Sequence, residues 1–282
     1  MSKSKKQAKI SLVLVVYQNI FNVTAMFAQK TTHLGTAFKQ YFKIVPALTK
    51  ELKHEAHYIR HSVYCEDLGY EPTQPDKFEL DEYDAYALHL LIHSIKQNTF
   101  IGCVRIITPP TDDPNWLLPF EKACGNTLNR SIIDPEKLPR KQIAEVSRLA
   151  VLSSFRRRKG EANSPINLSE NDLDPALTPR FPYIPLGLYY GTVELAHLYN
   201  IKVLFLLTEE RLATHFNKLG IQIKFIGSPV NHRGLRFPSM VDVNKTIDNI
   251  RPLFRPLYRA IAEDIQAGLE EKSQQDAGTP QS

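Results

Sequence analysis

AEVSRLAVLSSFRRRKG, residues 144–160, is the stretch that decides the fold. Glu145 and Arg148 lie inside its apolar first half, and a buried charge is costly unless it is paired. This core strand keeps an acid and a base and is followed by four cations. We therefore expect it to contribute side chains to a functional site as well as to the hydrophobic core. The apolar residues that predict the buried strand are Val146, Leu149, Ala150, Val151 and Leu152.

The spacing of Glu145 and Arg148 sets a condition on this strand. Residues three apart on a regular strand point to opposite faces of the sheet. Both side chains reach one site only if the strand contains a bulge, which is a common feature beside active sites. The alternative is a peripheral ion pair on an edge strand, and the apolar residues on both sides count against it.

An upstream hairpin carries a further charge, Arg105. ALHLLIHSI (87–95) and FIGCVRIIT (100–108) have the pattern of two strands joined by a turn. Strand alternation puts Arg105 on an otherwise apolar face, where a guanidinium needs a carboxylate partner because it cannot lose its charge. The apolar residues of that face are Ile101, Cys103 and Ile107, and the nearest carboxylates upstream are Glu79, Asp81, Glu82 and Asp84.

An Asp81–Arg105–Asp84 arrangement would form a rigid polar floor for a pocket. The alternative is that Arg105 extends from a sheet edge with only its stem buried. A helix that begins after Thr49 adds Arg60, which lies four residues before Tyr64 and so on the same face. For Arg60 taken alone, a solvated arginine is the simpler interpretation.

The remaining pattern predicts one mixed α/β domain with a single central sheet over residues 36–260. Residues 1–35 form an N-terminal extension, 159–181 a surface insertion broken by prolines, and 261–282 a polar, disordered tail. The expected strands are in 41–47, 202–207, 221–227 and 239–243, and the expected helices are 185–200 and 208–220, with Thr208 as N-cap and Gly220 as the stop.

Composition and charge exclude several classes of function. The chain has 282 residues, 43% of them hydrophobic, and a net charge of +5. Four lysines within the first ten residues, which hold no acid, supply most of that charge, so the body is close to neutral and nucleic-acid binding is disfavoured. The three cysteines form no CxxC, which indicates neither a metal site nor a disulfide framework.

The N-terminus supports two interpretations. A basic segment, 2–9, precedes the apolar run ISLVLVV, as in a signal peptide, but Gln18 and Asn19 interrupt the run early. The other interpretation is that translation starts at Met26. No run reaches the roughly 18 to 20 apolar residues of a membrane span, so we expect a cytoplasmic protein without a transmembrane segment, for which peripheral membrane contact stays open.

Several short motifs, in this order, resemble those of the acyl-homoserine-lactone synthases and the related N-acyl amino acid synthases of the GNAT superfamily. They are RHSVY, FELDEYD, GCVRII and EVSRLAV. The chain is more similar still to the acyltransferases associated with the PEP-CTERM/exosortase sorting system, through VYCEDLGYE, FPYIPLGLY, EERL and HRGLRFP. The resemblance covers roughly residues 41–243 and implies a GNAT-like acyltransferase fold.

The resemblance also implies roles for individual residues. The helix pair Arg60 and Tyr64 matches substrate-site positions of the synthases. The ExDxYD and hairpin motifs match Glu79, Asp81, Asp84 and Arg105 as substrate-binding residues. Glu145 and Arg148 match the ExxR motif, with Glu145 as candidate general base for an acceptor amine and Arg148 as a brace for Glu145 or a ligand for an acceptor carboxylate.

One departure concerns the acyl donor. Acetyl-CoA-dependent relatives place a Gly-rich phosphate loop after this strand, whereas here FRRRKGE offers only Gly160. This resembles the synthases that take acyl groups from acyl carrier protein, whose acidic helix and single phosphopantetheine phosphate suit the four cations. The residues expected to bind the carrier are Arg156, Arg157, Arg158 and Lys159.

The predicted activity is therefore transfer of a long-chain acyl group from acyl carrier protein to an amine-bearing acceptor such as an amino acid. Acyl-CoA stays open as donor, and no tightly bound cofactor is expected. The alternatives are an acyl-homoserine-lactone synthase that uses S-adenosylmethionine and a non-catalytic regulator that binds acyl carrier protein. The insertion and the different C-terminal half count against the first alternative, and the retention of five site charges counts against the second.

Overall fold

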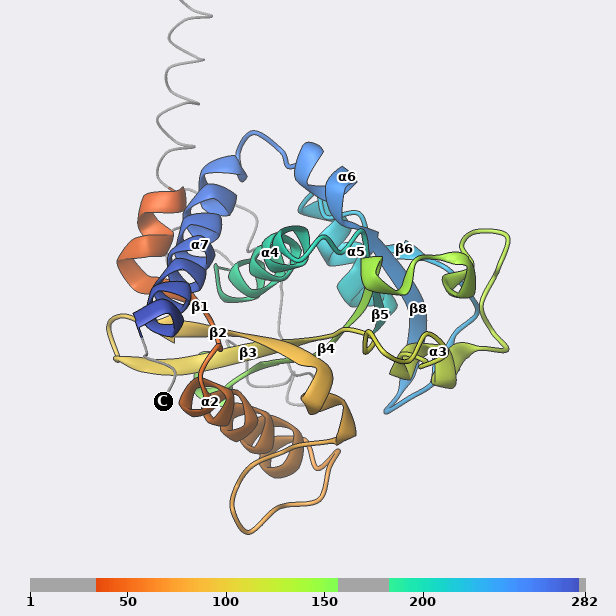
Figure 1. Cartoon of the computed structure of the whole chain (residues 1–282), viewed down its shortest axis with the longest axis horizontal. Helices are drawn as coiled ribbons and strands as arrows, with labels where there is room; N and C mark the ends of the chain where they lie inside the picture. Colours follow the sequence, from red (N-terminus) through yellow and green to blue (C-terminus); the bar gives the residue numbers. More distant parts are fainter. Residues whose placement is uncertain (1–33, 157–182, 279–282) are drawn as a thin grey trace, which may run out of the picture.

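A computed structural model describes residues 34–156 and 183–278. Its centre is an eight-stranded sheet in the order β1-β2-β3-β4-β5-β8-β6, with β7 paired to β8 (Figure 1). β4 and β5 run parallel and the other pairs are antiparallel, so the sheet is mixed as in the GNAT fold. The strands are Phe42–Pro46, Ala87–Ser94, Thr99–Ile107, Ile143–Val151, Val203–Thr208, Lys224–Phe225, Val230–Asn231 and Leu235–Asp242.

Helices cover both faces of this sheet (Figure 1). The face with the larger apolar core is covered by α4 (Tyr183–Leu198) and α7 (Arg255–Gly278). The opposite face is covered by α2 (Lys50–Arg60) near β2 and β3, and by the short α3 (Pro119–Cys124) near β5. Two further α-helices are α5, Glu210–Lys218, and α6, Val243–Asp248, and residues 34–41 are also helical.

The hairpin predicted from the sequence is β2 and β3, and its alternation holds over most of its length. Cys103, Arg105 and Ile107 share the face that α2 and α3 cover. Ile101 does not, because a bulge between Ile92 and His93 shifts the register and Ile101 packs in the core under α4. The expected placement of Ile101 beside Arg105 is therefore wrong.

The bulge predicted in β4 is present. The β3–β4 register shifts between Cys103, which pairs with Ala150, and Arg105, which pairs with Ser147. Arg148 lies in the shifted segment with a backbone φ of 52°, in the left-handed region that residues other than glycine rarely adopt. This turn of the backbone brings Arg148 to the same pocket as Glu145.

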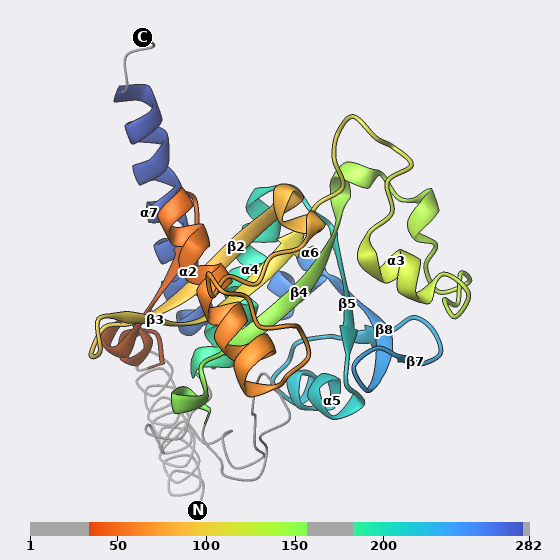
Figure 2. The same cartoon turned by 90° about the horizontal axis from the view of Figure 1, so that it is seen from below.

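β4 and β5 pair over only a short length before they separate. Three parallel pairs join them, the last between Glu145 and Phe205. Both strands continue beyond this point, β4 to Val151 and β5 to Thr208, and Figure 2 shows them diverging. Within the described part of the chain, the edge of β4 that faces β5 has no strand partner after Glu145, which leaves an opening in the sheet.

Two expectations about the ends of elements are wrong. Residues 261–278 belong to α7 rather than to a disordered tail, because Leu257, Ile261 and Ile265 recur at helical spacing and are fully buried under the polar residues that dominate the composition. Thr208 ends β5, and Glu209 is the N-cap of α5. Gly220 ends α5 as expected, with φ 91°.

At the expected start of the domain, residues 34–41 are helical, and Leu34 and Phe38 are buried. Residues 1–33 and the expected insertion 159–181 lie outside the described residues. Among the helices that the structure does describe, none combines the length and the apolar character that crossing a membrane requires.

Candidate active site

A pocket of about 720 Å³ occupies the opening between β4 and β5. Its walls come from both strands, from the segment after α2, from α3 and from the β7–β8 hairpin. Arg60 and Asp84 lie behind this wall and complete the set of charges. The residues predicted from the sequence that line the pocket are Tyr64, Glu79, Asp81, Arg105, Glu145 and Arg148.

Six of the predicted residues form a closed ring of alternating charge, which we call the charge ring: Arg60, Asp84, Arg105, Asp81, Arg148 and Glu79. Each arginine forms ion pairs with two of the carboxylates, and each carboxylate forms ion pairs with two of the arginines. No charge in the ring therefore depends on a single partner.

Distances in the charge ring are those of direct charge-assisted hydrogen bonds. Arg60 binds Asp84 through two nitrogens, at 2.5 and 3.0 Å, and also donates to Glu79. Arg105 Nη1 lies 2.5 Å from Asp81 Oδ1 and 3.1 Å from Asp84 Oδ1. The Arg148 side chain closes the ring, with Nη2 2.9 Å from Glu79 Oε1 and 3.3 Å from Asp81 Oδ2.

Burial makes this pairing obligatory. Arg60 is fully buried and Arg105 is 2% exposed, and neither guanidinium can become neutral. Burial alone would raise the pKa of Glu79, but hydrogen bonds from Arg148 and the charge of Arg60 outweigh it and hold that pKa below its usual value. The same balance lowers the pKa of Asp84, with Arg60 as the main partner. Glu79 and Asp84 are therefore held in their ionised forms by the arginines of the ring.

A π-helix contributes Tyr64 to one wall of the pocket. α2 ends at Arg60 and continues as a π-helix, His61–Asp67, a widened turn that is common at functional sites. It places Tyr64 so that its hydroxyl donates to the Leu149 carbonyl at 3.1 Å, and the Arg148 guanidinium lies 5.4 Å from the Tyr64 ring centroid. Burial raises the pKa of Tyr64 to about 12, so Tyr64 acts as a neutral donor.

Glu145 is separate from the charge ring. Its carboxylate is 5% exposed and accepts a hydrogen bond from the Phe120 N–H at 2.7 Å. Burial raises its pKa to about 8, although the Phe120 hydrogen bond and the charges of Arg105 and Arg148 lower it in part. The expected brace between Arg148 and Glu145 is absent among the described residues, because Arg148 donates to Glu71, Glu79 and Asp81 instead.

Sequence reasoning missed the residues that extend the charge ring toward solvent. Glu71 accepts from Arg148 at 3.1 Å and also from Arg233. Arg236 donates to Glu209 and, at 3.3 Å, to the Arg233 carbonyl. These residues lie in the motifs VYCEDLGYE, EERL and HRGLRFP, but only the folded chain brings the three motifs together.

One buried cluster next to the charge ring has the composition of a cation site. His57, Asp84 and His89 place ligand atoms within 4.8 Å of one another, and burial lowers the pKa of His57 to about 4 and of His89 to about 3. Both imidazoles are thus neutral, with no hydrogen-bond partner among the described residues. Asp84, however, is already ion-paired with Arg60 and Arg105, so a dication here would meet repulsion from both arginines.

Only one of the four residues expected to bind a carrier protein, Arg156, lies within the described residues. Arg157, Arg158 and Lys159 lie outside the described residues. The Arg156 side chain is 7% exposed and pairs with Asp67, so in this conformation it is not offered at the surface.

Ser147 and Cys65, two side chains near the site that could act as nucleophiles, are poorly suited to that role. Ser147 Oγ accepts from Arg105 Nε at 3.0 Å, which holds it as part of the pocket floor. Cys65 is buried, and burial raises the pKa of its thiol, so it is a poor thiolate. His232 lines the pocket, and its pKa is lowered by burial and by the charges of Arg148 and Arg236.

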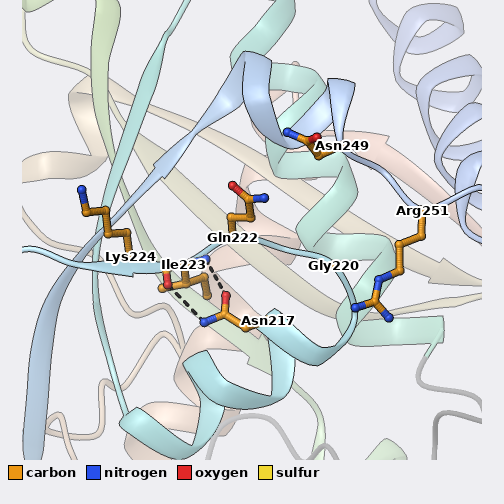
Figure 3. A pocket seen from close by; sticks show the side chains of 7 residues that line it. All are labelled: Asn217, Gly220, Gln222, Ile223, Lys224, Asn249 and Arg251. Atoms are coloured by element: carbon orange, nitrogen blue, oxygen red, sulfur yellow. Dashed lines mark hydrogen bonds between the residues drawn. The ribbon is translucent and has the colours of Figure 1, made fainter.

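A second pocket, of about 440 Å³, is more open and lies elsewhere on the fold (Figure 3). It is formed by the end of α5, the segment before β6 and the residues around Asn249. Lys224 and Arg251 are its two cations, and the Asn217 side chain is committed to the Ile223 backbone, at 2.7 and 3.2 Å. None of the residues predicted for the active site lines it.

Residues 59–163 match the family model described as an acetyltransferase (GNAT) domain. This range contains the charge ring, Glu145 and the bulged strand β4. No curated protein is similar enough in sequence to match the chain significantly.

Solved structures with the same fold include two acyl-homoserine-lactone synthases. The AHL synthase LasI is 21% identical, with a TM-score of 0.50, over 74% of this chain and 93% of its own. BjaI, a CoA-dependent synthase solved with SAM and isopentyl-CoA, is 18% identical, with a TM-score of 0.52, over 79% and 98%. FeeM, an N-acyl amino acid synthase from uncultured soil microbes, is 13% identical, with a TM-score of 0.47, over 74% and 94%. The protein therefore has the GNAT-like α/β fold that these synthases share, and the match of residues 59–163 to the acetyltransferase domain identifies it as an acyltransferase enzyme.

Proposed function

We propose that this protein transfers an acyl group, most simply a long chain, from a carrier-bound thioester to the amine of a small acceptor such as an amino acid. The observation that carries the proposal is Glu145, a buried carboxylate with its pKa raised to about 8, at the point where β4 and β5 separate. A base in such a position can take a proton from an amine that attacks a thioester in the same pocket.

The chemistry balances with Glu145 alone as proton carrier. The neutral acceptor nitrogen attacks the thioester carbonyl carbon, a C–N bond forms, and the C–S bond then breaks. Glu145 takes the proton that nitrogen loses and can return it to the departing sulfur. Its pKa of about 8 is close to that of an α-amino group, about 8, and of a thiol, about 8.5, so both transfers are nearly balanced in energy.

The opening between β4 and β5 supports a place for the thioester. The unpaired edge of β4 after Glu145 can hydrogen-bond an extended pantetheine arm, as a missing strand would. Backbone N–H groups at the bulge near Arg148 are the candidates for stabilising the developing oxyanion. Apolar residues at this part of the pocket, Val146, Leu149, Leu206, Leu207 and Leu212, suit an acyl chain.

For the charge ring we propose a positioning role in the same reaction. The ring is rigid because each member has two partners, and it contacts Tyr64 through Arg148. It orients the acceptor next to Glu145 through Asp81, Arg105 and Arg148, which line the pocket. Arg60, Glu79 and Asp84 support these three from behind.

The proposed donor is an acyl carrier protein, and the proposed compartment is the cytoplasm. The sequence after β4 lacks a Gly-rich loop for a CoA pyrophosphate and is basic instead. Through its motif resemblance, we also place the enzyme with the PEP-CTERM/exosortase sorting system. Acyl-CoA is the second candidate donor, because the BjaI structure of the same fold is of a CoA-dependent enzyme.

The second candidate function is an acyl-homoserine-lactone synthase, which the folds of LasI and BjaI favour. A third is a regulator that binds acyl carrier protein without turnover. It is opposed by the charge ring and the buried Glu145, because a fold used only for binding gains nothing from burying these charges.

The test is mass spectrometry of small molecules from cells that express the wild type, Glu145→Gln, or the exposed-carboxylate control Glu136→Gln. The host is supplied with the cognate acyl carrier protein. We expect a new N-acyl species with the wild type and with the control, and none with Glu145→Gln. Its mass identifies the acceptor and separates N-acyl amino acids from acyl-homoserine lactones.

Two other outcomes contradict the proposal. Stable binding of acyl carrier protein without any new product supports the regulator. A product that persists with Glu145→Gln removes Glu145 as the base. With purified enzyme, acyl-carrier-protein and acyl-CoA donors of the same chain length are then compared directly, and a faster rate with acyl-CoA would overturn the donor assignment.

A further inference from the structure

The β7–β8 hairpin brings His232, Arg233 and Arg236 to the wall of the active-site pocket. Within the charge ring, by contrast, every arginine is already held by two carboxylates. Arg148, which the sequence suggested as a ligand for an acceptor carboxylate, is occupied in this way. Outside the ring, Lys122 donates to the Tyr83 hydroxyl, and the hairpin holds the two arginines of this pocket that can grip a carboxylate with a planar guanidinium.

Donor groups remain available on both hairpin arginines. A guanidinium has five N–H donors. Arg233 uses Nη2 toward Glu71, and Arg236 uses Nη1 toward Glu209 and Nη2 toward the Arg233 carbonyl. Within residues 34–156 and 183–278, no hydrogen-bond partner contacts Nε or Nη1 of Arg233 or Nε of Arg236. The two side chains are partly exposed, at 28% and 14%.

The charge balance around the pocket depends on Glu145. Among the described residues in and directly behind the pocket wall, six cations face five other carboxylates, and Glu145 in the ionised form that acts as base makes the two numbers equal, so the subsite rests on geometry and not on net charge. The pKa of His232 lies below its ordinary value, because of burial and the charges of Arg148 and Arg236. The cations are Arg60, Arg105, Lys122, Arg148, Arg233 and Arg236, and the carboxylates are Glu71, Glu79, Asp81, Asp84 and Glu209.

Backbone strain is a separate observation at the same position. Arg233 has φ 52° at the tip of the hairpin, where the following Gly234 has φ 98°. A left-handed backbone is unfavourable for a residue with a Cβ, and glycine or asparagine adopts it far more readily. An arginine kept in this conformation points to a use for its guanidinium.

We infer that Arg233 and Arg236, beside His232, form a subsite for the carboxylate of the acceptor. The inference rests on the proposed function and names the acceptor class as α-amino acids rather than simple amines or amino alcohols. A carboxylate held here shares Arg233 with Glu71 or displaces it, and leaves the amine free to approach Glu145 in the same pocket.

The test measures binding, so that it does not depend on turnover. N-dodecanoyl derivatives of the twenty amino acids, and the methyl ester of each, are titrated by calorimetry into the wild type, Arg233→Asn, Arg236→Gln and the double variant. Asparagine at 233 keeps the left-handed backbone and removes the guanidinium. Arg251→Gln, an exposed arginine of the second pocket, is the matched control, and unfolding midpoints check that every variant folds.

We expect the wild type and the control to bind at least one acid about tenfold or more tightly than its ester, the size of a charged hydrogen bond. The double variant is expected to lose this preference and to bind the ester as the wild type does. Equal binding of acid and ester by the wild type, an unchanged preference in the double variant, or no binding of either ligand would each overturn the subsite.

An additional titration with 4′-phosphopantetheine separates the acceptor from the donor, whose phosphate is also an anion. Loss of phosphopantetheine binding in the double variant, with the acid preference intact, would reassign the two arginines to the donor. The proposed function is tested apart from this. A wild type that prefers acids but acylates no amino acid keeps the subsite and overturns the transferase.

Discussion

Arg148 and Arg233 both have a left-handed backbone, and both donate to the same Glu71 carboxylate oxygen, although 85 residues separate them in the chain. One lies at the bulge of β4 and the other at the tip of the β7–β8 hairpin. Glu71 thus couples the charge ring to the wall proposed to bind the acceptor. Two strained arginines at one carboxylate are most simply explained by a site that needs both guanidinium groups in fixed positions.

The activity is expected to depend on pH through Glu145. Only the ionised carboxylate accepts a proton, so the rate should rise with pH and level off above about 8. Glu145→Gln should be slower by about 10²- to 10⁴-fold and should lose this part of the profile. Rates at saturating acceptor between pH 6 and pH 9 check this, with Glu136→Gln as control, and a wild-type profile that levels off below pH 6 would contradict it.

Stability should depend on the same group in the opposite direction. The pKa of Glu145 is raised in the folded state, so the folded protein binds more protons than the unfolded chain between about pH 4.5 and pH 8. Glu145 therefore contributes stability that is present at low pH and is lost as pH rises through this window. In urea unfolding at pH 6 and pH 8.5, Glu145→Gln should lose less stability with rising pH than the wild type. If both proteins lost the same amount of stability between pH 6 and pH 8.5, the pKa of Glu145 would not be raised and its carboxylate would be exposed to water.

His57 and His89 should make the fold sensitive to acid. Their folded-state pKa values, about 4 and about 3, lie below the ordinary 6.5, so the unfolded chain binds more protons and stability falls as pH drops below 6.5. Each histidine should cost about 2 kcal/mol between pH 7 and pH 5. A double variant, His57→Gln with His89→Gln, should show a correspondingly smaller loss by urea unfolding. If it loses as much as the wild type, other groups dominate.

Breaking the charge ring should destabilise the protein more than removing an exposed charge. Arg105→Ala leaves Asp81 and Asp84 each short of one partner inside the fold, which should cost about 3–5 kcal/mol. Arg259→Ala, at an exposed position of α7, should change the free energy of unfolding by less than about 0.5 kcal/mol. Equal effects of the two substitutions would show that the ring contributes little to stability.

The strain at Arg148 can be tested with two neutral replacements. Arg148→Asn and Arg148→Val both remove the guanidinium from the ring, but asparagine tolerates φ 52° and a β-branched side chain does not. We expect Val to be less stable than Asn by about 1–2 kcal/mol, measured by urea unfolding. Equal stabilities would mean that the bulge relaxes when Arg148 is lost.

Much of this protein was determined by local sequence. The hairpin of β2 and β3, the helix that begins after Thr49 and the strand β5 follow from periodicity and capping, because these depend on residues close together in the chain. The need for a partner for Arg105, and for a bulge between Glu145 and Arg148, followed from the cost of burying charge and from strand alternation. The polar composition of the last residues led to the wrong prediction of a disordered tail, because the segment is held as a helix by a narrow stripe of buried apolar residues in α7.

Other features were decided only by tertiary structure. Which carboxylate meets which arginine in the charge ring depends on the packing of α2 against β3 and β4, and no local pattern encodes it. Glu71 and Arg233 meet because the β7–β8 hairpin and the segment after the π-helix fold onto one pocket. The raised pKa of Glu145 likewise arises from burial beneath α3. Sequence showed which charges need partners, because burial makes unpaired charge costly, and the arrangement of the elements in space chose the partners.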